Sequence, residues 1–439
     1  MLKYLLYMFF SVLVWYNLIL SVMILLCLML LININSLHYI NLGYLFSVDL
    51  VSLGFMMLSI WIVGMMLLSS MKIFKLEVYS VLFNWINVMI MVFLFLVFMA
   101  VNFLLFYIFF EILLVLTLLL IVGWGYQVER INAGYYIMFY TLVVSYPFLM
   151  GIFFVYWESG SLVMFYFYIN FKLNLFIILA LLFSFLVKMP MYFVHLWLLK
   201  AHLEAPVSGS MVLAGIMLKL GGYGLIRVVG MMEGEIHKSI WVIIMSVSLL
   251  GGVYVSLLCM YQVDMKLLIA SSSVVHMGLV IGGIFSLSSM GLVSAFLLMV
   301  GHGLCSSGLF SISNMMYERF GSRSFFISKG LLGFIPSLSF WMFLLVSSNM
   351  AAPFSLNLFG EIGLLMSLLN WSSWMMFTLV IISFISSIYS LFLYMYSQFG
   401  GFILGLFSFS NMNYCENLVM FLHWVPLNLL FLMISDLVV

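Results

Sequence analysis

Charged side chains are scarce in this chain, and that scarcity constrains its fold more than any other feature. Only 6% of its 439 residues are Asp, Glu, Lys or Arg, whereas about a quarter of the residues in a soluble domain are charged. A water-soluble fold cannot cover its surface with so few charges. The sequence therefore predicts an integral membrane protein.

The few charges are separated by long uncharged runs, and a spanning helix needs about 20 apolar residues. Several runs are long enough for two spans. Only helices and closed barrels satisfy the backbone in lipid, and the apolar residues here are continuous rather than alternating, which excludes a barrel. We therefore predict an all-α polytopic membrane protein. The uncharged runs are residues 4–48, 78–110, 131–157, 239–263, 267–317, 330–360 and 362–415.

The pattern predicts about fourteen transmembrane helices in a single transmembrane domain, residues 1–439. We expect N-terminal helices in 1–70, a first repeat in 79–229, a second repeat in 239–397 and a C-terminal helix at 418–435. The expected spans are 3–16, 18–35, 50–69, 79–99, 101–121, 133–156, 175–197, 207–229, 239–260, 264–286, 290–314, 327–369 (broken), 372–397 and 418–435.

Two of these spans are interrupted by proline. Pro190 follows Lys188 in FLVKMPMYFVHLW (185–197), and Pro353 precedes Glu361 by eight residues. Proline removes a backbone donor and breaks the helical ladder. Broken helices at corresponding places in two halves are typical of transporters built from inverted repeats. We therefore predict two inverted five-helix repeats, each with one broken helix.

Several function classes are excluded by composition and spacing. The net charge of +1 gives no electrostatic case for binding nucleic acid. The four cysteines lie far apart and form no CxxC spacing. The sequence has no GxGxxG, Walker or haem-ligand pattern. We therefore expect no cofactor and no metal bound by this chain.

Glu111 and Lys188 are charges inside apolar runs, where each costs about 2.5–3.5 kcal/mol or more at the bilayer centre. We interpret them as an ion pair between neighbouring helices, in which Lys188 keeps its proton until Glu111 moves away or is neutralised. Two other interpretations stay open. Glu111 could be held protonated or lie at the interface, and Lys188 could extend to the helix end.

Lys219 lies in LAGIMLKLGGYGL with no acid in its own segment. We interpret it as the central lysine of a proton relay. The neighbouring glycines allow close approach by another helix, so glycine packing with an extended lysine is the competing interpretation.

His276, His302 and Glu361 complete the set of intramembrane titratable groups. Imidazole both accepts and donates a proton, so the histidines suit a relay, although a lone buried histidine is often structural. Glu361 is the acidic end of the series, or else a protonated carboxyl that pins its helix. Lys200, His202 and Glu204 are expected in a loop that is either solvated or a proton entrance. The predicted proton relay is Glu111, Lys188, Lys219, His276, His302 and Glu361.

Five segments resemble a known family: FYIFFEILL (106–114), LVKMPMYFVHLWLLKAHLEAPVSGSMVLAGIMLKLGGYGLIR (186–227), LIASSSVVHMGLV (268–280), SSNMAAPFSLNLFGEI (347–362) and SLFLYMYSQFG (390–400). They are similar to subunit 4 of mitochondrial NADH:ubiquinone oxidoreductase (respiratory complex I), an antiporter-like membrane subunit. The resemblance covers about residues 75–430; the first 70 residues match only in hydropathy.

The resemblance implies fourteen spans, inverted repeats, and functional roles at the six relay positions named above. It implies a proton-translocating subunit of NADH:ubiquinone reductase in the mitochondrial inner membrane, without a redox centre of its own. NADH, FMN, iron–sulfur clusters and ubiquinone would belong to other subunits. Its partners would be the other membrane-arm subunits, including neighbouring antiporter-like ones, and inner-membrane lipids. Departures from the family pattern occur at Leu116, Val128, Leu199, Tyr261, Phe354 and Phe399.

Two other functions compete with this one. The first is a subunit of a Na⁺/H⁺ or K⁺/H⁺ antiporter built on the same charged residues. The second is a scaffold for a membrane arm whose charges do no chemistry. Without the resemblance of the five segments, the sequence would support the complex I and the antiporter interpretations almost equally.

Overall fold

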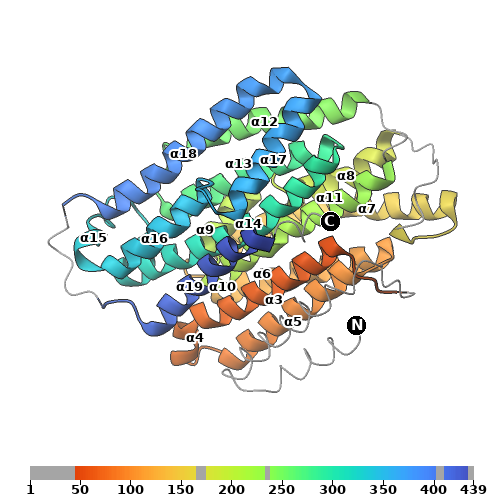
Figure 1. Ribbon diagram of the computed structural model, residues 1–439. Helices are drawn as coiled ribbons and strands as arrows, with labels where there is room; N and C mark the ends of the chain where they lie inside the picture. The colour runs from red at the N-terminus through yellow and green to blue at the C-terminus, as the bar shows by residue number, and fades with distance from the viewer. Residues whose placement is uncertain (1–44, 165–174, 233–237, 402–409, 434–439) are drawn as a thin grey trace. The chain divides into compact units, whose positions relative to one another are not determined.

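The computed structural model describes residues 45–164, 175–232, 238–401 and 410–433. Within these ranges every extended regular element is a helix, and strand pairing is limited to three isolated bridges (Figure 1). The predicted all-α class is confirmed for the described residues. The spans expected at 3–16 and 18–35 lie outside them.

The helix bounds follow the predicted spans closely in several places. The span expected at 50–69 is α3, and the span expected at 239–260 is α12. The helices in chain order are α3 (Leu50–Ser69), α4 (Met71–Lys75), α5 (Ser80–Met99), α6 (Phe103–Trp124), α7 (Arg130–Ser159), α8 (Leu175–Lys188), α9 (Leu196–Glu204), α10 (Val207–Val212), η2 (Leu213–Met217), α11 (Leu218–Met232), α12 (Lys238–Cys259), α13 (Met265–Phe285), α14 (Ser289–Phe320), α15 (Leu331–Phe334), α16 (Pro336–Asn349), α17 (Leu356–Trp371), η3 (Ser373–Met375), α18 (Met376–Gln398), α19 (Tyr414–Leu429) and η4 (Leu430–Met433).

The described residues contain 10 helices long and apolar enough to cross a membrane, one of them the combined segment Val207–Met231. The shorter α8 is also apolar. These findings establish a polytopic membrane chain. The total of about fourteen spans stays a prediction, because part of the chain lies outside the described ranges.

The chain divides into two compact units, which we describe separately. The first unit comprises Met1–Lys188 and Glu204–Ile236, and the second comprises Met189–Leu203 and His237–Val439. The single domain and the inverted repeats remain predictions.

An aromatic cluster forms part of the core of the first unit, where α3 packs against α5 and α5 against α6. The ring of Tyr223 lies 5.3 Å from Phe98 and 6.1 Å from both Phe55 and Phe106. All four side chains are buried. The Tyr223 hydroxyl donates to the Phe98 carbonyl oxygen at 3.0 Å, so the polar end of this ring is satisfied within the apolar core.

Close approach of α11 and α8 depends on Gly224, because a Cβ at this position would collide with the Phe185 ring. Gly224→Val is expected to destabilise the unit by about 1–3 kcal/mol, since overpacking forces side chains off their rotamers. Thermal melting of the solubilised chain in its native assembly measures this. Gly123→Ala is the control, because no atom lies within 4 Å of that added Cβ. Equal melting temperatures for the two variants would contradict the packing argument.

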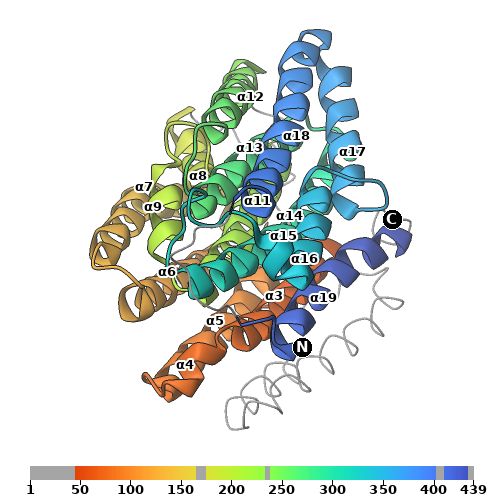
Figure 2. The same ribbon diagram turned by 90° about the vertical axis from the view of Figure 1, so that its left-hand side faces the viewer.

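The second unit is built around α13 and α14. α14 packs against α13, α16, α17 and α19, while α18 packs against α12 and α16. α17 and α18 are consecutive helices joined through the short η3 turn (Figure 2). The candidate spans of α13 and α14 are among the most buried in the described chain, which explains why they can carry polar side chains away from lipid.

Both predicted helix breaks are confirmed. α8 ends at Lys188 and α9 begins at Leu196, with Pro190 in the non-helical stretch between them. α16 ends at Asn349 and α17 begins at Leu356, with Pro353 in the gap. Ala351 and Phe354 in the second gap adopt positive φ angles of 57° and 68°, and the Asn357 side chain donates across the gap to the Ser348 carbonyl at 2.9 Å.

The sequence predicted a loop around Lys200, His202 and Glu204, and this prediction is wrong. These residues lie in the helix α9, and only Lys200 is exposed. The His202 ring is fully buried and stacks on Phe310 with centroids 4.5 Å apart. Polar residues between apolar runs indicate a loop in a soluble chain, but in a membrane bundle they can point into the protein.

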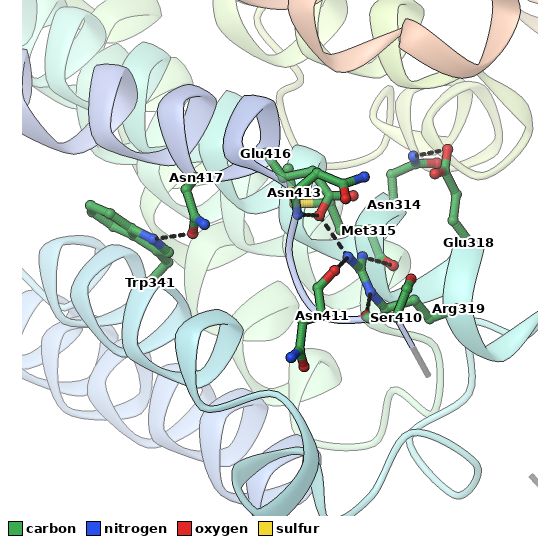
Figure 3. A network of polar contacts seen from close by, with 10 residues as sticks. All are labelled: Asn314, Met315, Glu318, Arg319, Trp341, Ser410, Asn411, Asn413, Glu416 and Asn417. Carbon is green, nitrogen blue, oxygen red and sulfur yellow. Dashed lines mark hydrogen bonds and ion pairs between the residues drawn. The ribbon is translucent and has the colours of Figure 1, made fainter. Parts of the chain in front are cut away.

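Arg319, near the end of α14, joins that helix to the start of α19 (Figure 3). Its guanidinium donates to the carbonyl oxygens of Met315, Ser410 and Asn411. It also forms an ion pair with Glu416 at 2.6 Å. The same carboxylate accepts from the Asn413 backbone N–H at 3.0 Å, which completes a capping box on α19.

Arg319→Met is therefore expected to destabilise the second unit by about 3 kcal/mol, because it leaves a partly buried carboxylate without its cation. The melting temperature of the assembled chain measures this. Lys72→Met removes an exposed cation of α4 and should leave the melting temperature unchanged. A similar small effect from both variants would show that the Arg319 contacts are not stabilising.

Candidate functional site

The six predicted relay residues divide equally between the two units. All lie on helices, and four of them are nearly inaccessible: Lys188 (4% exposed), Lys219 (0%), His276 (3%) and His302 (2%). Glu111 and Glu361 are half-buried. The first unit contains Glu111, Lys188 and Lys219, and the second contains His276, His302 and Glu361.

Glu111 and Lys188 interact electrostatically without touching. The Lys188 Nζ lies 3.7 Å from the centroid of the Phe110 ring and has no hydrogen-bond partner among the described residues. No ion pair within 4 Å joins it to Glu111, although each lies in the other's electrostatic field. The direct ion pair expected from the sequence is therefore not formed. The aromatic face beside Glu111 holds the ammonium through a cation–π contact instead.

The position of Lys188 follows from the helix break. It is the last residue of α8, where unpaired carbonyl oxygens give the helix end a partial negative charge. That charge favours an ammonium group. Ser145 of α7 contributes to the electrostatic environment of Glu111, so the carboxyl group has a polar neighbour from a third helix.

Lys219 is fully buried in the first turn of α11, directly after the π-helical segment η2. Its Nζ donates to the Ala214 carbonyl oxygen at 2.5 Å. A π-helical turn changes the helical register, and such turns are frequent at functional sites. The sequence predicted one continuous span here. Hydrophobic periodicity carries no signal for a π turn, so this feature was missed.

The second unit brings His276, His302 and Glu361 together in one cluster. His276 Nδ1 lies 3.4 Å from Glu361 Oε1, and the rings of His276 and His302 lie 5.4 Å apart between centroids. His276 therefore lies between the other two groups. The spatial order is His302, His276, Glu361, which differs from their order in the chain.

A small cavity of about 10 Å³ adjoins this cluster. It has room for about one water molecule. His276 and Glu361 line it, and α18 adds the hydroxyls of Ser383 and Ser386. These serines could not be singled out from the sequence, because single hydroxyls in an apolar span usually bond only to their own helix.

Two further charged features were missed. Arg227 of α11 pairs with Asp49 at 2.5 Å and lies 4.9 Å from the Tyr223 ring centroid. In the sequence, Asp49 and Arg227 are opposite charges at the ends of two apolar runs, and this pattern could have predicted their ion pair. Lys266, at the start of α13, is a cation that is only 1% exposed.

The arrangement is suited to holding and passing protons. Carboxyl, ammonium and imidazole groups gather on buried helices, and imidazole can accept and donate within one path. In the described ranges no three His, Cys, Asp or Glu side chains are grouped so that they could hold a metal ion.

Two family models match the chain. One, described as NADH:quinone oxidoreductase/Mrp antiporter, TM, matches residues 100–390. The other, described as NADH-ubiquinone oxidoreductase chain 4, amino terminus, matches residues 1–97. The second match extends the family relationship through the first 70 residues, for which the sequence analysis relied on hydropathy.

Curated and solved relatives agree with these matches. A protein of Ceratitis capitata named NADH-ubiquinone oxidoreductase chain 4 is 52% identical over 398 residues, covering 90% of this chain and 88% of its own. A chain of respiratory complex I from Thermus thermophilus superposes with a TM-score of 0.86 at 20% identity, covering 97% of this chain and 94% of that one. A chain of the Mrp complex from Dietzia sp. superposes at 0.78 and 15% identity, covering 88% and 76%. At 20% and 15% identity, these two structural matches show that the chains share a fold.

Proposed function

The chain belongs to the NADH-ubiquinone oxidoreductase chain 4 family, and from that premise we propose how it translocates protons as a membrane-arm subunit of respiratory complex I. It is a subunit of a proton-pumping NADH:ubiquinone reductase. Quinone reduction elsewhere in that complex drives the transfer. We propose that the proton moves through these six titratable residues, four of them buried and two half-buried.

In the first unit, the separation between Glu111 and Lys188 is the switch. The Lys188 ammonium is held by the Phe110 ring and not by a hydrogen bond, so a change in the local electric field can move it. Movement toward or away from Glu111 changes the electrostatic potential around the first unit. That potential determines whether Lys219 holds or releases its proton.

In the second unit, His302, His276 and Glu361 accept the proton in that spatial order. The 3.4 Å separation between His276 and Glu361 is the observation that carries this proposal. It places an acid and an imidazole almost at hydrogen-bonding distance inside helices that have almost no other charge. Small motions complete the bond, so a proton can pass between them.

The finer architecture is part of the proposal. About fourteen spans in two inverted five-helix repeats accord with the two observed helix breaks. The mitochondrial inner membrane is the proposed location. Other membrane-arm subunits, including antiporter-like neighbours, and inner-membrane lipids are the proposed partners. Nicotinamide, flavin, iron–sulfur and quinone chemistry is assigned to other subunits, and this chain carries protons only.

An antiporter subunit is the second candidate, supported by the shared fold with the Mrp complex chain. The 52% identity to a chain 4 protein favours complex I. Sodium- or potassium-dependent proton flux in the absence of NADH would favour the antiporter. We expect proton flux to require NADH and quinone and to be independent of both cations.

A native gel of mildly solubilised membranes tests the assignment. The gel is stained for NADH oxidation, and each band is searched by mass spectrometry for peptides of this chain. We expect the peptides in the large NADH-oxidising band. Peptides confined to a smaller band without that activity would overturn the assignment to complex I.

A further inference from the structure

The break between α16 and α17 carries a buried amide that the proposed relay does not use. Asn357 is the second residue of α17, and its side chain is only 2% exposed. The amide nitrogen donates to the Ser348 carbonyl oxygen of α16 at 2.9 Å, which joins the two helices across the break. The amide oxygen is buried and has no hydrogen-bond partner among the described residues. A buried acceptor of this kind needs an explanation.

The amide oxygen of Asn357 packs against α14 at the residue before His302. A Cβ added at Gly301 would collide with this oxygen, and it would lie 3.2 Å from the Asn357 backbone nitrogen. The missing side chain at Gly301 therefore lets the first turn of α17 lie directly on the α14 turn that carries His302. Asn357 thus connects the end of α16 and the middle of α14 to the start of α17.

Glu361 follows Asn357 by four residues on α17. Backbone hydrogen bonds of an α-helix join residues at this spacing, so a shift of the first turn carries Glu361 with it. The turn between them also lies on α14, because a Cβ at Gly360 would be 2.8 Å from the Leu298 backbone nitrogen. The Glu361 carboxyl lies 3.4 Å from His276 Nδ1, just beyond the usual hydrogen-bond length. A small shift of α17 therefore decides whether the two groups bond.

The conformation of the break needs contacts that hold it. Ala351 and Phe354 adopt positive φ angles, which are unfavourable for residues other than glycine. Such a backbone persists only where the surrounding structure fixes it. The bond from Asn357 to Ser348 spans both residues, so it helps to hold the break, and with it the start of α17, in one position.

We propose that Asn357 is a positioning residue for proton transfer between His276 and Glu361. Its side chain ties the first turn of α17 to Ser348 and Gly301. This attachment sets the distance from Glu361 to His276. The amide of Asn357 neither gives nor takes a proton, and it acts only through the position of Glu361. The inference rests on the proposed role of Glu361 in the relay.

Asn357→Leu tests the inference in the intact complex. Leucine has a similar branched shape but can make neither polar contact. We expect coupled NADH oxidation to fall about tenfold, because the reacting groups are misplaced, and the remaining oxidation to pump fewer protons per NADH than the wild type. The matched control is Asn314→Leu. Asn314 is also buried in the second unit, donates to Glu318 at 2.9 Å and has an unpaired amide oxygen; its substitution should leave the proton yield unchanged.

Gly301→Ala disturbs the same contact from α14. The added methyl group displaces the Asn357 oxygen, while every titratable side chain stays in place in the sequence. We expect the same loss of proton yield as in Asn357→Leu. Gly333→Ala is the control in this unit, because no atom lies within 4 Å of that added Cβ.

Lower melting temperatures with a normal proton yield in both Asn357→Leu and Gly301→Ala would overturn the inference, since Asn357 would then only stabilise the fold. If neither variant assembles, electron cryomicroscopy of the unsubstituted complex decides. It should show the Asn357 amide bonded to the Ser348 carbonyl and lying on Gly301, and an amide away from both would overturn the inference.

Glu361→Gln separates this inference from the proposed relay. A reduced proton yield in Glu361→Gln, together with normal yields in Asn357→Leu and Gly301→Ala, would leave the relay standing and exclude the positioning role. A normal proton yield in Glu361→Gln would exclude the relay itself.

Discussion

Replacing Lys219 with methionine is expected to reduce coupled NADH oxidation by about 10²–10⁴-fold, the range typical of losing a positioned acid–base group. Lys219 is fully buried, and its Nζ donates to the Ala214 carbonyl at the π-helical turn. Methionine fills similar space but carries no proton. The measurement is NADH oxidation by membrane vesicles that sustain a proton gradient.

The assembled complex must be present for this result to report on the relay. A native gel should show the Lys219→Met complex at wild-type abundance, because removing a buried cation does not remove apolar packing. Lys72→Met is the matched control, since it removes an exposed lysine of α4. Normal coupled turnover in Lys219→Met would exclude the central relay lysine.

Replacing Glu361 with glutamine is expected to have the second large effect, a fall of about 10²-fold or more in coupled turnover. Glutamine has the same shape as glutamate but cannot give up a proton, so no proton could pass between residue 361 and His276. Coupled NADH oxidation in the same vesicles measures this. Glu361→Asp should recover part of the activity, because it keeps the carboxyl group.

Glu416→Gln is the matched control for Glu361→Gln. Both carboxyl groups belong to the second unit, and both have a nitrogen partner: His276 for Glu361 and Arg319 for Glu416. Glu416 joins helices and has no place in the relay, so its substitution should lower the melting temperature and leave the proton yield of the remaining complex intact. A normal proton yield in Glu361→Gln together with a reduced proton yield in Glu416→Gln would show that the cluster of His302, His276 and Glu361 is structural.

The helices could be predicted from the sequence because charges are so rare. A long uncharged run has one low-energy conformation in lipid, a helix, and α3 begins and ends at the bounds of the predicted span 50–69. The breaks could be predicted because Pro190 and Pro353 each combine a missing backbone donor with a charged residue nearby in the same apolar span. The candidate residues could be predicted because a buried charge such as Lys219 is costly.

Features set by three-dimensional packing could not be predicted. The π turn before Lys219 cannot be read from hydrophobic periodicity, because the span around it is buried on nearly every side. The position of His276 between His302 and Glu361 depends on how α13, α14 and α17 pack.

The most direct test of the relay is the number of protons pumped per NADH oxidised by the complex that carries this chain. It should be measured in sealed vesicles for the wild type, Lys219→Met and Glu361→Gln at matched complex content. We expect the residual NADH oxidation of both variants to pump fewer protons per NADH than the wild type. An unchanged ratio in both variants would show that protons do not pass through these residues.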